Sequence, residues 1–364
     1  MSDAQDPSGG ASSRQTRITI ADVARAAGVS RSAVSFALND RPGIAADTRA
    51  RILRIADELG WRPSARARAL VNDRADAVGF VFARPVELLI ADPFFSQFLA
   101  GLEMVLSPAD QALVLQVITG GPEDEAAAYR RMAGDGRVDG FVLTDATEDD
   151  PRFAVLEQTG LPAVIAGDAA AETPFPTVGP DEFAGTRVGV EHLLGLGHRR
   201  IAYVAGPQNM QHARRRRDAW HDTLVEAGAQ PDLLRYSDFT GPGGAGATEQ
   251  LLAEADPPTA IVYANDLMAM AGMAALHRAG WRVPGEISVV GYDDIALAAH
   301  TSPPLTTVRQ DVIGIGRLVA AELLQRITGG PIETPPLQAP TLVVRETTGP
   351  APPPRAAPHR GRGR

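Results

Sequence analysis

The sequence predicts a small all-α helix-turn-helix head at the N-terminus, followed by an α/β core of two doubly wound parallel-sheet subdomains. Two observations predict this division. Residues 19–39 carry apolar positions at helical spacing on both sides of a glycine, whereas buried strands alternate with amphipathic helices from Asp76 onward. At 364 residues the chain is long enough for two or three domains with sizeable cores.

The head opens with two short helices in the stretch TIADVARAAGVSRSAVSFALN, which starts at Thr19. Thr19 and Asp22 are spaced to cap the first helix, Gly28 ends it, and Ser30 caps the second. A recognition helix presents its N-terminal residues to base edges. Four side chains are expected on this outward face: Arg31, Ser32, Ser35 and Phe36. The alternative is an ordinary pair of helices in a core, since such patterns also occur without DNA.

A third helix is predicted from Ala46 to Leu59, with one apolar stripe made of Ile52, Leu53, Ala56 and Leu59. Ala45 stands where a serine or threonine cap is usual, so this helix is expected to begin weakly. Trp61 is expected to cover the three-helix core. The segment from Ser64 to Leu70 can form a short hinge helix, but it is too short to be stable alone, so a solvated linker is the alternative.

From Asp76 onward the sequence predicts seven strands and seven helices. The expected strands are Ala77–Phe82, Ala112–Ile118, Asp139–Leu143, Pro162–Ala166, Arg200–Ala205, Thr259–Ala264 and Ile287–Tyr292. The expected helices are Ser96–Leu106, Glu123–Ala133, Gly185–Gly195, Arg214–Ala227, Thr248–Ala255, Leu267–Ala279 and Val312–Thr328. So many βα units fit two domains of similar size, with a ligand cleft at the carboxyl ends of their strands.

The expected boundaries follow from these patterns and from composition. They are a disordered N-terminus (1–16), a helix-turn-helix DNA-binding head (17–62), a hinge (63–75), a core (76–346) and a disordered Pro/Arg tail (347–364). Within the core, one subdomain is expected to combine 76–177 with 306–335, and the other 178–305 with 336–346.

The charge of the chain is divided unevenly. Between Arg14 and Arg74 there are 12 arginines and 6 acidic residues, so this segment has a net charge of +6. The whole chain has a net charge of −9, so the rest of the chain carries −15. A basic segment on an acidic body indicates a nucleic-acid-binding head. There are no cysteines, no apolar run of membrane-spanning length and no apolar segment of signal-peptide type near the start. We therefore expect a cytoplasmic protein without disulfides or membrane contact.

Over nearly its whole length the chain resembles the lactose/galactose repressor (LacI/GalR) family. The matching stretches include the helix-turn-helix segment quoted above, WRPSARARAL, DPFFSQFLAGLE, GTRVGVEHLLGLGHRRIAYVAGP, YANDLMAMAGMAALHRAGWRVPGEISVVGYDD and PPLTTVRQD. The resemblance implies a dimeric or tetrameric transcription regulator with a periplasmic-binding-protein-like core. An effector in the cleft would change the closure of the core and hence the spacing of two DNA-binding heads on an inverted-repeat operator.

For DNA binding, the resemblance places Arg31 and Ser32 at base-reading positions. Phe36 stands at a third reading position where many members have arginine, so it offers only apolar contact, for instance to a thymine methyl group. Thr19 and Asn39 match positions that contact the DNA backbone. The hinge positions that enter the minor groove are Ala67 and Leu70, with the two Leu70 side chains of a dimer wedging a central base step.

For effector binding, eight residues are expected in or near the cleft: Asp92, Phe94, Asp168, Arg216, Phe239, Asn265, Asp293 and Gln310. Arg216 matches an effector-binding arginine, although it could instead belong to a solvated patch with its arginine neighbours. Asn265 and Asp293 match effector-facing positions at strand ends, with turn formation or helix capping as the alternative. Acidic, amide, guanidinium and aromatic groups together suit a sugar or another polyol.

Three other functions compete with this one. A free sugar-binding protein would share the core but not the basic head. An enzyme, a metal site or a cofactor is not expected, because His192, His198 and His212 have no spaced partners for a metal cage or a Ser-His-Asp set. A regulator that uses its effector as a corepressor, or that activates, stays open.

Overall fold

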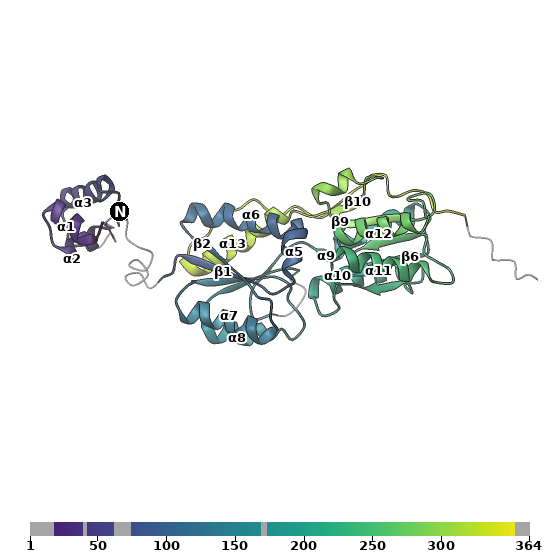
Figure 1. Cartoon of the computed structure of the whole chain (residues 1–364), viewed down its shortest axis with the longest axis horizontal. Coiled ribbons are helices and arrows are strands. Elements are labelled where there is room, and N and C mark those ends of the chain that lie inside the picture. The colour runs from purple at the N-terminus through teal and green to yellow at the C-terminus, as the bar shows by residue number, and fades with distance from the viewer. Residues whose placement is uncertain (1–17, 39–41, 62–73, 169–172, 354–364) are drawn as a thin grey trace, which may run out of the picture. The chain divides into compact units, whose positions relative to one another are not determined.

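The computed structural model describes residues 18–38, 42–61, 74–168 and 173–353. The chain divides into two compact units, a head over residues 1–75 and a core over residues 76–364 (Figure 1). In the described ranges, no helix is both long and apolar enough to cross a membrane.

The head contains three helices, α1 (Ile20–Ala27), α2 (Arg31–Leu38) and α3 (Ala46–Glu58). The expected caps of the first two are confirmed. The Asp22 carboxylate accepts from the Thr19 backbone N–H at 2.9 Å and from the Thr19 hydroxyl at 2.7 Å. Gly28 ends α1 at φ 64°, and the Ser30 hydroxyl accepts from the Ala33 N–H at 3.1 Å. These local bonds fix the turn between the two helices.

The head packs around a small apolar core. Its fully buried side chains are Val23, Val34 and Ile52, and Trp61 packs against them as expected. Ala45 is the N-cap of α3, as expected, and makes no side-chain cap bond, so the weak start stays a prediction. The prediction for Leu53 is wrong, because that side chain is 44% exposed. Ile55 packs against the core instead, three positions after Ile52 on the same face of the helix.

The core contains two sheets. The first has the order β2-β1-β3-β4-β5 with all neighbours parallel. Its strands are β1 (Ala77–Phe82), β2 (Ala112–Val117), β3 (Gly140–Leu143), β4 (Ala163–Ala166) and β5 (Thr177–Val178). The second has the order β11-β10-β9-β8-β6-β7, parallel except for the β10–β11 pair. Its strands are β6 (Ile201–Ala205), β7 (Leu234–Tyr236), β8 (Ala260–Tyr263), β9 (Ser288–Asp293), β10 (Thr306–Arg309) and β11 (Thr341–Val343).

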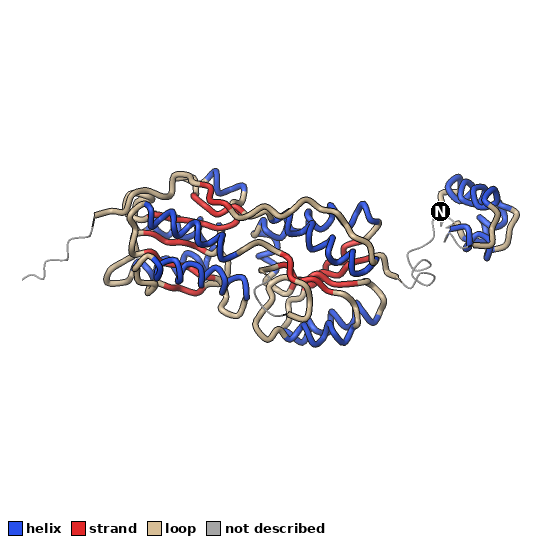
Figure 2. The backbone as a smooth tube through the Cα atoms, turned by 180° about the vertical axis from the view of Figure 1, so that it is seen from behind, coloured by secondary structure: helices blue, strands red, loops and turns tan. Residues whose placement is uncertain are grey.

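Helices cover both faces of each sheet (Figure 2). The first subdomain carries α5 (Val86–Ala91), α6 (Pro93–Leu106), α7 (Pro122–Gly134), α8 (Pro151–Thr159) and α13 (Val312–Thr328). The second carries α9 (Glu182–Gly195), α10 (Gln211–Glu226), α11 (Gly241–Leu252) and α12 (Asp266–Arg278), and short 3₁₀ helices span Ser107–Ala109 and Ala296–His300. The pairs α6–α13 and α7–α8 pack together in the first subdomain, and α9–α10 and α11–α12 in the second. The expected doubly wound architecture is confirmed.

One expected subdomain boundary is wrong. Residues 306–309 form β10, which pairs with β9 and β11 in the second sheet, so they do not belong with the first subdomain. The chain crosses to the first subdomain only afterwards, where α13 packs against β3 and β4. The strand was missed because it is short and follows two prolines, and such a stretch is typical of a loop.

The expected disordered tail from residue 347 is also wrong for residues 347–353. Thr347 is fully buried, and its hydroxyl donates to the Val289 carbonyl at 2.7 Å. The Gly349 carbonyl accepts from Nε2 of His198 at 3.1 Å. Proline-rich composition predicts disorder, but here the backbone finds partners on the second subdomain. Residues 354–364 lie outside the described residues.

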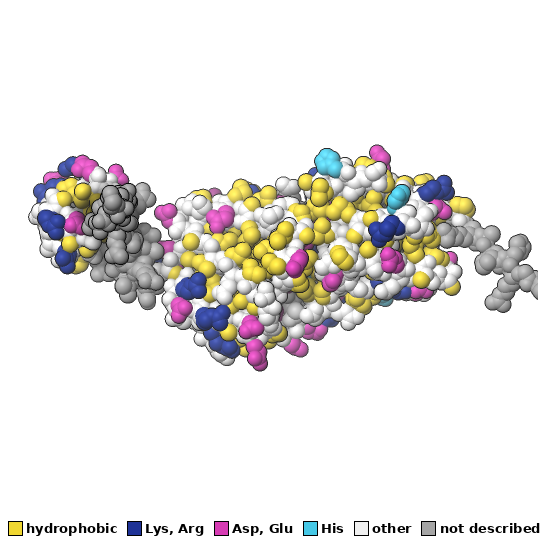
Figure 3. Space-filling model, in the orientation of Figure 1, with side chains coloured by type: hydrophobic (Ala, Val, Ile, Leu, Met, Phe, Trp, Pro, Cys, Tyr) yellow, Lys and Arg dark blue, Asp and Glu magenta, His cyan; other side chains and the backbone are white. Residues whose placement is uncertain are grey.

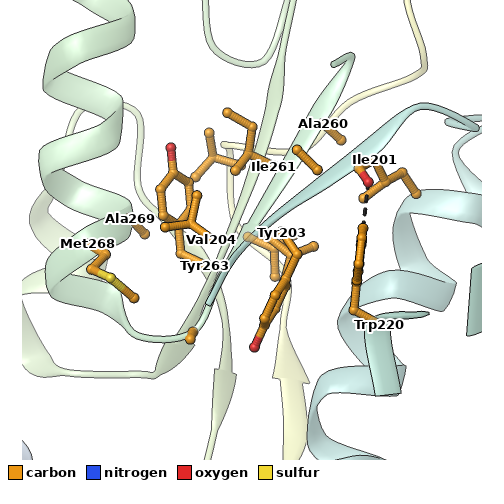
Figure 4. Close-up of a cluster of buried hydrophobic side chains, with 14 of the residues drawn as sticks. Ile201, Tyr203, Val204, Trp220, Ala260, Ile261, Tyr263, Met268 and Ala269 are labelled. Atoms are coloured by element: carbon orange, nitrogen blue, oxygen red, sulfur yellow. Dashed lines mark hydrogen bonds between the residues drawn. The ribbon is translucent and has the colours of Figure 1, made fainter. Parts of the chain in front are cut away.

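The largest apolar core lies in the second subdomain, around β6 and β8 (Figure 4). Tyr203 stacks on Trp220 with ring centroids 5.7 Å apart, and Trp220 donates its indole N–H to the Ile201 carbonyl at 3.2 Å. The buried indole therefore joins α10 to the first strand of this sheet, which fixes the helix whose first turns face the cleft.

Candidate functional site

The outward face of α2 in the head is accessible as expected. Arg31, Ser32 and Phe36 are exposed, with Phe36 at 40%, while Ser35 is half-buried. The Ser32 hydroxyl lies 2.9 Å from the Ser30 hydroxyl, so the cap of the helix also orients a base-reading candidate. The side chains expected to read bases are thus accessible, apart from the half-buried Ser35.

The remaining DNA-contact candidates lie before and after this helix. Thr19 is exposed, and its hydroxyl donates to Asp22. That hydrogen bond is the main reason why the pKa of Asp22 lies below its usual value. Asn39, Ala67 and Leu70 lie outside the described residues, so their roles stay predictions.

A cavity lies in the core at the carboxyl ends of the strands of both sheets, and we call it the central cavity. It has a volume of about 600 Å³ counted out to open solvent, and both subdomains contribute to its wall. Seven of the eight expected cleft residues line it: Asp92, Phe94, Arg216, Phe239, Asn265, Asp293 and Gln310. A site of this kind is where ligands bind in open α/β sheets.

Asp168 is the expected cleft residue that is absent from this wall. Gly167 lines the cavity instead, and the Asp168 carboxylate accepts from Nε of Arg215 at 3.1 Å. Since Asp168 belongs to the first subdomain and Arg215 to α10, this ion pair joins the two subdomains beside the cavity.

Arg216 is held inside the site and does not belong to a solvated patch. Its guanidinium donates to both carboxylate oxygens of Glu182, at 2.6 and 3.2 Å, and to the Ala264 carbonyl at 2.6 Å. It also lies 3.7 Å from the ring centroid of Tyr292. The neighbouring arginines of α10 are more exposed. Burial alone would lower the pKa of Arg216. The negative charge of Glu182 is the largest of the effects that outweigh burial, and the pKa is raised.

Asn265 and Phe239 are joined by a hydrogen bond in the cavity wall. The Asn265 amide accepts from the Met268 N–H and so caps α12, while its nitrogen donates to the Phe239 carbonyl, both at 3.0 Å. Phe239 has φ 66°, a left-handed conformation that is uncommon for a bulky residue. Its ring stacks on His212 and lies under the Arg84 guanidinium. Asn265 therefore both caps a helix and lies in the cavity wall.

Three further polar groups form an acceptor-rich corner of the cavity. The Asp293 carboxylate accepts from the Gln310 amide at 2.6 Å, and the Gln310 carbonyl oxygen is buried without a partner among the described residues. Asp92 accepts from the Phe94 N–H at 3.0 Å as the cap of α6. Burial raises the pKa of Asp92, and it raises the pKa of Asp293 well above its usual value, to which the Asp92 charge also contributes.

Sequence reasoning missed five polar residues of the wall, namely Arg84, Thr144, Asp145, Glu182 and His212. Arg84 donates to Asp145 across a short ion pair, and burial lowers the pKa of His212 to about 4. Thr144 and Asp145 directly follow β3, so the rule that selected Asn265 and Asp293 at strand ends could have found them. Nothing in the sequence pairs Glu182 with Arg216.

The wall suits a hydroxyl-rich ligand. Both arginines are already paired, whereas Asp92 and Asp293 have no ion-pair partner among the described residues. The cavity therefore offers hydrogen-bond acceptors to hydroxyl groups and no unpaired cation to an anion. Among the described residues there is also no group of three or more histidine, aspartate or glutamate side chains that could hold a metal ion.

A helix-turn-helix head and a ligand cavity in a two-subdomain core define a DNA-binding regulator. Family models agree with both parts: residues 19–64 match "Bacterial regulatory proteins, lacI family", and residues 190–348 match "Periplasmic binding protein-like domain". The HTH-type transcriptional regulator CelR of Thermobifida fusca is 37% identical over 339 residues, which cover 92% of this chain and 99% of CelR. The chain belongs to the lacI family of transcriptional regulators, as expected, and not to an enzyme family.

Two solved structures extend this comparison. A lac repressor dimer bound to operator and the anti-inducer ONPF has a TM-score of 0.79 and 33% identity, and the match covers 91% of this chain and 99% of that one. A transcriptional regulator CelR–cellobiose complex has a TM-score of 0.68 and 34% identity, covering 91% of this chain and 100% of that one. The expected family and fold are thus confirmed over nearly the whole chain.

Proposed function

We propose that the chain is a transcriptional repressor that binds operator DNA through its head and a sugar in its central cavity, with the sugar controlling operator affinity. The observation that carries this proposal is that one lacI-family chain combines an exposed α2 face with a carboxylate-rich cavity between its subdomains. The structural relatives support it, since one is bound to operator and the other is a cellobiose complex. As a regulator of genes, the chain is expected in the cytoplasm.

The working form is proposed to be a homodimer on an inverted-repeat operator. Apolar side chains are exposed on neighbouring elements of the first subdomain: Ile90 on α5, Met104 on α6, and Leu115 and Val117 on the edge strand β2. Ile90 is 82% exposed, which is costly for a side chain that stays in water. The visible face of the core carries many hydrophobic and few charged side chains in its middle (Figure 3). A second copy is the natural cover, because two-fold dimers are the commonest assemblies.

Thermal-shift screening with sugars, followed by operator binding with each hit, tests the effector. If a sugar binds and leaves operator affinity unchanged, the control we propose is contradicted. A sugar that lowers operator affinity is an inducer, and one that raises it is a corepressor. The basic head should also make DNA affinity fall by about a hundredfold or more between roughly 50 and 200 mM salt.

Asp293→Asn tests the cavity. It replaces one oxygen acceptor of the buried carboxyl with an amide donor, so we expect effector affinity to fall by about 1–3 kcal/mol for each hydroxyl bond lost, with operator affinity near wild type. Asp256→Asn is the matched control, because that carboxylate lies on the same subdomain but is 74% exposed. Equal effector affinities of the two variants would place the ligand elsewhere.

A further inference from the structure

A second cavity adjoins the central cavity, and we call it the outer cavity. It has a volume of about 750 Å³ counted out to open solvent. Its wall begins at the carboxyl ends of β1 and β3 and continues along the first residues of α7 and α8, where Pro122 and Pro151 lie. Asn209 and Met210 of the second subdomain complete it. The outer cavity thus lies between the two subdomains, like the central cavity.

Its place in the first sheet is that of a ligand site. The strand order β2-β1-β3 means that the chain turns to one side of β1 for β2 and to the other side for β3. The connections therefore diverge between β1 and β3 and leave a crevice outside their carboxyl ends. Residues that follow these two strands, Ala83 and Thr144, line the outer cavity.

The two cavities share one wall. Arg84, Thr144 and Asp145 line both of them, and the Arg84–Asp145 ion pair stands at the centre of this wall. Met210 accepts a further bond from Arg84 at 3.2 Å, so the partition is held from both subdomains. Nε of Arg84 is buried and has no hydrogen-bond partner among the described residues. A buried donor without an acceptor is costly, and a ligand oxygen at this wall would satisfy it.

The far side of the outer cavity is a closed polar network. Arg152 donates to Asp150 at 2.7 Å, to Glu125 at 3.3 Å and to the backbone carbonyls of Thr144 and Asp145 at 3.0 and 3.2 Å. These bonds hold the loop that carries Asp145 in place. Because Arg152 is fully engaged, it leaves no free cation for an anionic ligand, and burial raises the pKa of the Glu125 carboxyl.

We propose that the two cavities are adjacent subsites for one uncharged oligosaccharide, with one sugar unit in the central cavity, the next in the outer cavity and their glycosidic link beside the Arg84–Asp145 pair. Hydroxyl groups can donate to the carboxylates of both walls and accept from Nε of Arg84. A phosphorylated or acidic sugar would meet carboxylates that lack a free counter-charge. This inference rests on the proposed sugar effector and adds the size and charge of the ligand.

Filling the outer cavity alone tests the proposal. Ala83 is exposed and lines the outer cavity but not the central one, so Ala83→Phe reduces the outer space only. Asn209→Trp does the same from the opposite subdomain. Ala154→Phe is the matched control, because Ala154 is exposed on α8 and lies in neither wall. Thermal unfolding of each variant verifies that it folds.

The probes are glucose, galactose, lactose and the β-1,4- and α-1,4-linked glucose oligomers of up to four units, titrated by calorimetry into the full-length protein. We expect affinity to rise by about tenfold or more when the second unit is added, as one or two extra hydrogen bonds would give. Ala83→Phe and Asn209→Trp should abolish this gain while leaving single-unit binding unchanged, and Ala154→Phe should keep it.

The outcomes separate the two proposals. Two results overturn the two-subsite inference and leave the sugar effector intact. One is binding of a single sugar unit with no gain in affinity for longer sugars. The other is a gain in affinity that survives in both outer-cavity variants. If none of these sugars binds, the proposed sugar effector fails, and the inference falls with it.

Discussion

The head and the core hold their functional side chains in opposite ways. In the head, Arg31 and Phe36 stand on an exposed helix face over a core of a few apolar residues. In the core, Arg216 and Asp293 are buried and bonded to other side chains. DNA is a large ligand that must be met on a surface, whereas a small ligand is enclosed. Substitutions on the exposed face of α2 should therefore change binding and leave stability alone, while substitutions in the central cavity should change both.

The largest expected effect is that of Arg216→Ala on the stability of the core. Removing the guanidinium leaves Glu182 buried without its bidentate partner, which costs about 3–5 kcal/mol in free energy of unfolding. Urea unfolding followed by the fluorescence of Trp220, buried in the core, measures it.

Arg217→Ala is the control for this prediction. Arg217 is the next residue of α10, is partly exposed, and bonds to its neighbour Asp218 and to the Tyr236 hydroxyl. Its loss should cost about 1 kcal/mol or less. Equal destabilisation by the two substitutions would mean that the buried pair does not set the stability of the cavity wall.

The sequence predicted regular elements well where they depend on local pattern. The bounds of α13 match the prediction, and the seven expected strands are found within about a residue at each end. The start of α11 was missed, because GPGGAGA is unfavourable for a helix. The structure explains it: a Cβ at Gly244 would lie 2.5 Å from Cα of Met268, so glycine allows α11 and α12 to pack closely.

The central cavity was predictable only in part. Arg216, Asn265 and Asp293 were found by family resemblance and by their place at strand ends. Asp145 was overlooked although it follows a strand end. Its pairing with Arg84 was not predictable, because the ion pair joins residues 61 positions apart and depends on which strand ends meet. Sequence patterns report local order, whereas a cavity wall is assembled from distant segments.

The second prediction concerns pH and separates head from core. Burial lowers the pKa of His212 to about 4 and also lowers that of His198. Below about pH 6.5 the unfolded chain takes up protons that the folded core does not bind. The contribution of His212 to core stability is therefore fully present above about pH 6.5 and is lost as pH decreases toward 4, by at most about 3 kcal/mol. The raised pKa values of Asp92 and Asp293 act in the opposite direction, so the prediction concerns the difference between variants.

Urea unfolding of the full-length protein at a series of pH values checks this, with His212→Gln as the variant and exposed His221→Gln as the control on the same helix. His212→Gln should reduce the slope and the control should not. The head contains none of the 7 histidines. The hydrogen bonds from Thr19 hold the pKa of its Asp22 cap below the usual value. An equal pH slope for His212→Gln and the wild-type protein would contradict this prediction.

The third prediction tests the exposed face of the head. Arg31→Ala should weaken operator binding by about 1–3 kcal/mol and reduce the preference for operator over random DNA, because a side chain at the start of α2 contacts base edges. Head and core stability should stay within about 0.5 kcal/mol, since Arg31 is exposed. Arg54→Ala on α3 is the control, and it should leave the preference unchanged. Loss of affinity without loss of preference would make Arg31 a phosphate contact.

The smallest expected effect is a gain of stability in the head. Ala45 has the extended backbone of an N-cap, at φ −61° and ψ 142°, but it has no side chain that can accept from the first turn of α3. Ala45→Ser supplies that oxygen, so it should stabilise the head by about 0.5–2 kcal/mol. Ser30→Ala is the matched converse, because the Ser30 hydroxyl accepts from the Ala33 N–H at 3.1 Å, and it should destabilise by a similar amount. Thermal unfolding of the full-length protein, followed by the fluorescence of Trp61 in a variant whose core tryptophans are phenylalanine, measures both. A midpoint unchanged by Ala45→Ser but lowered by Ser30→Ala would mean that α3 draws its stability from Ile52 and Ala56 in the apolar core rather than from its first turn.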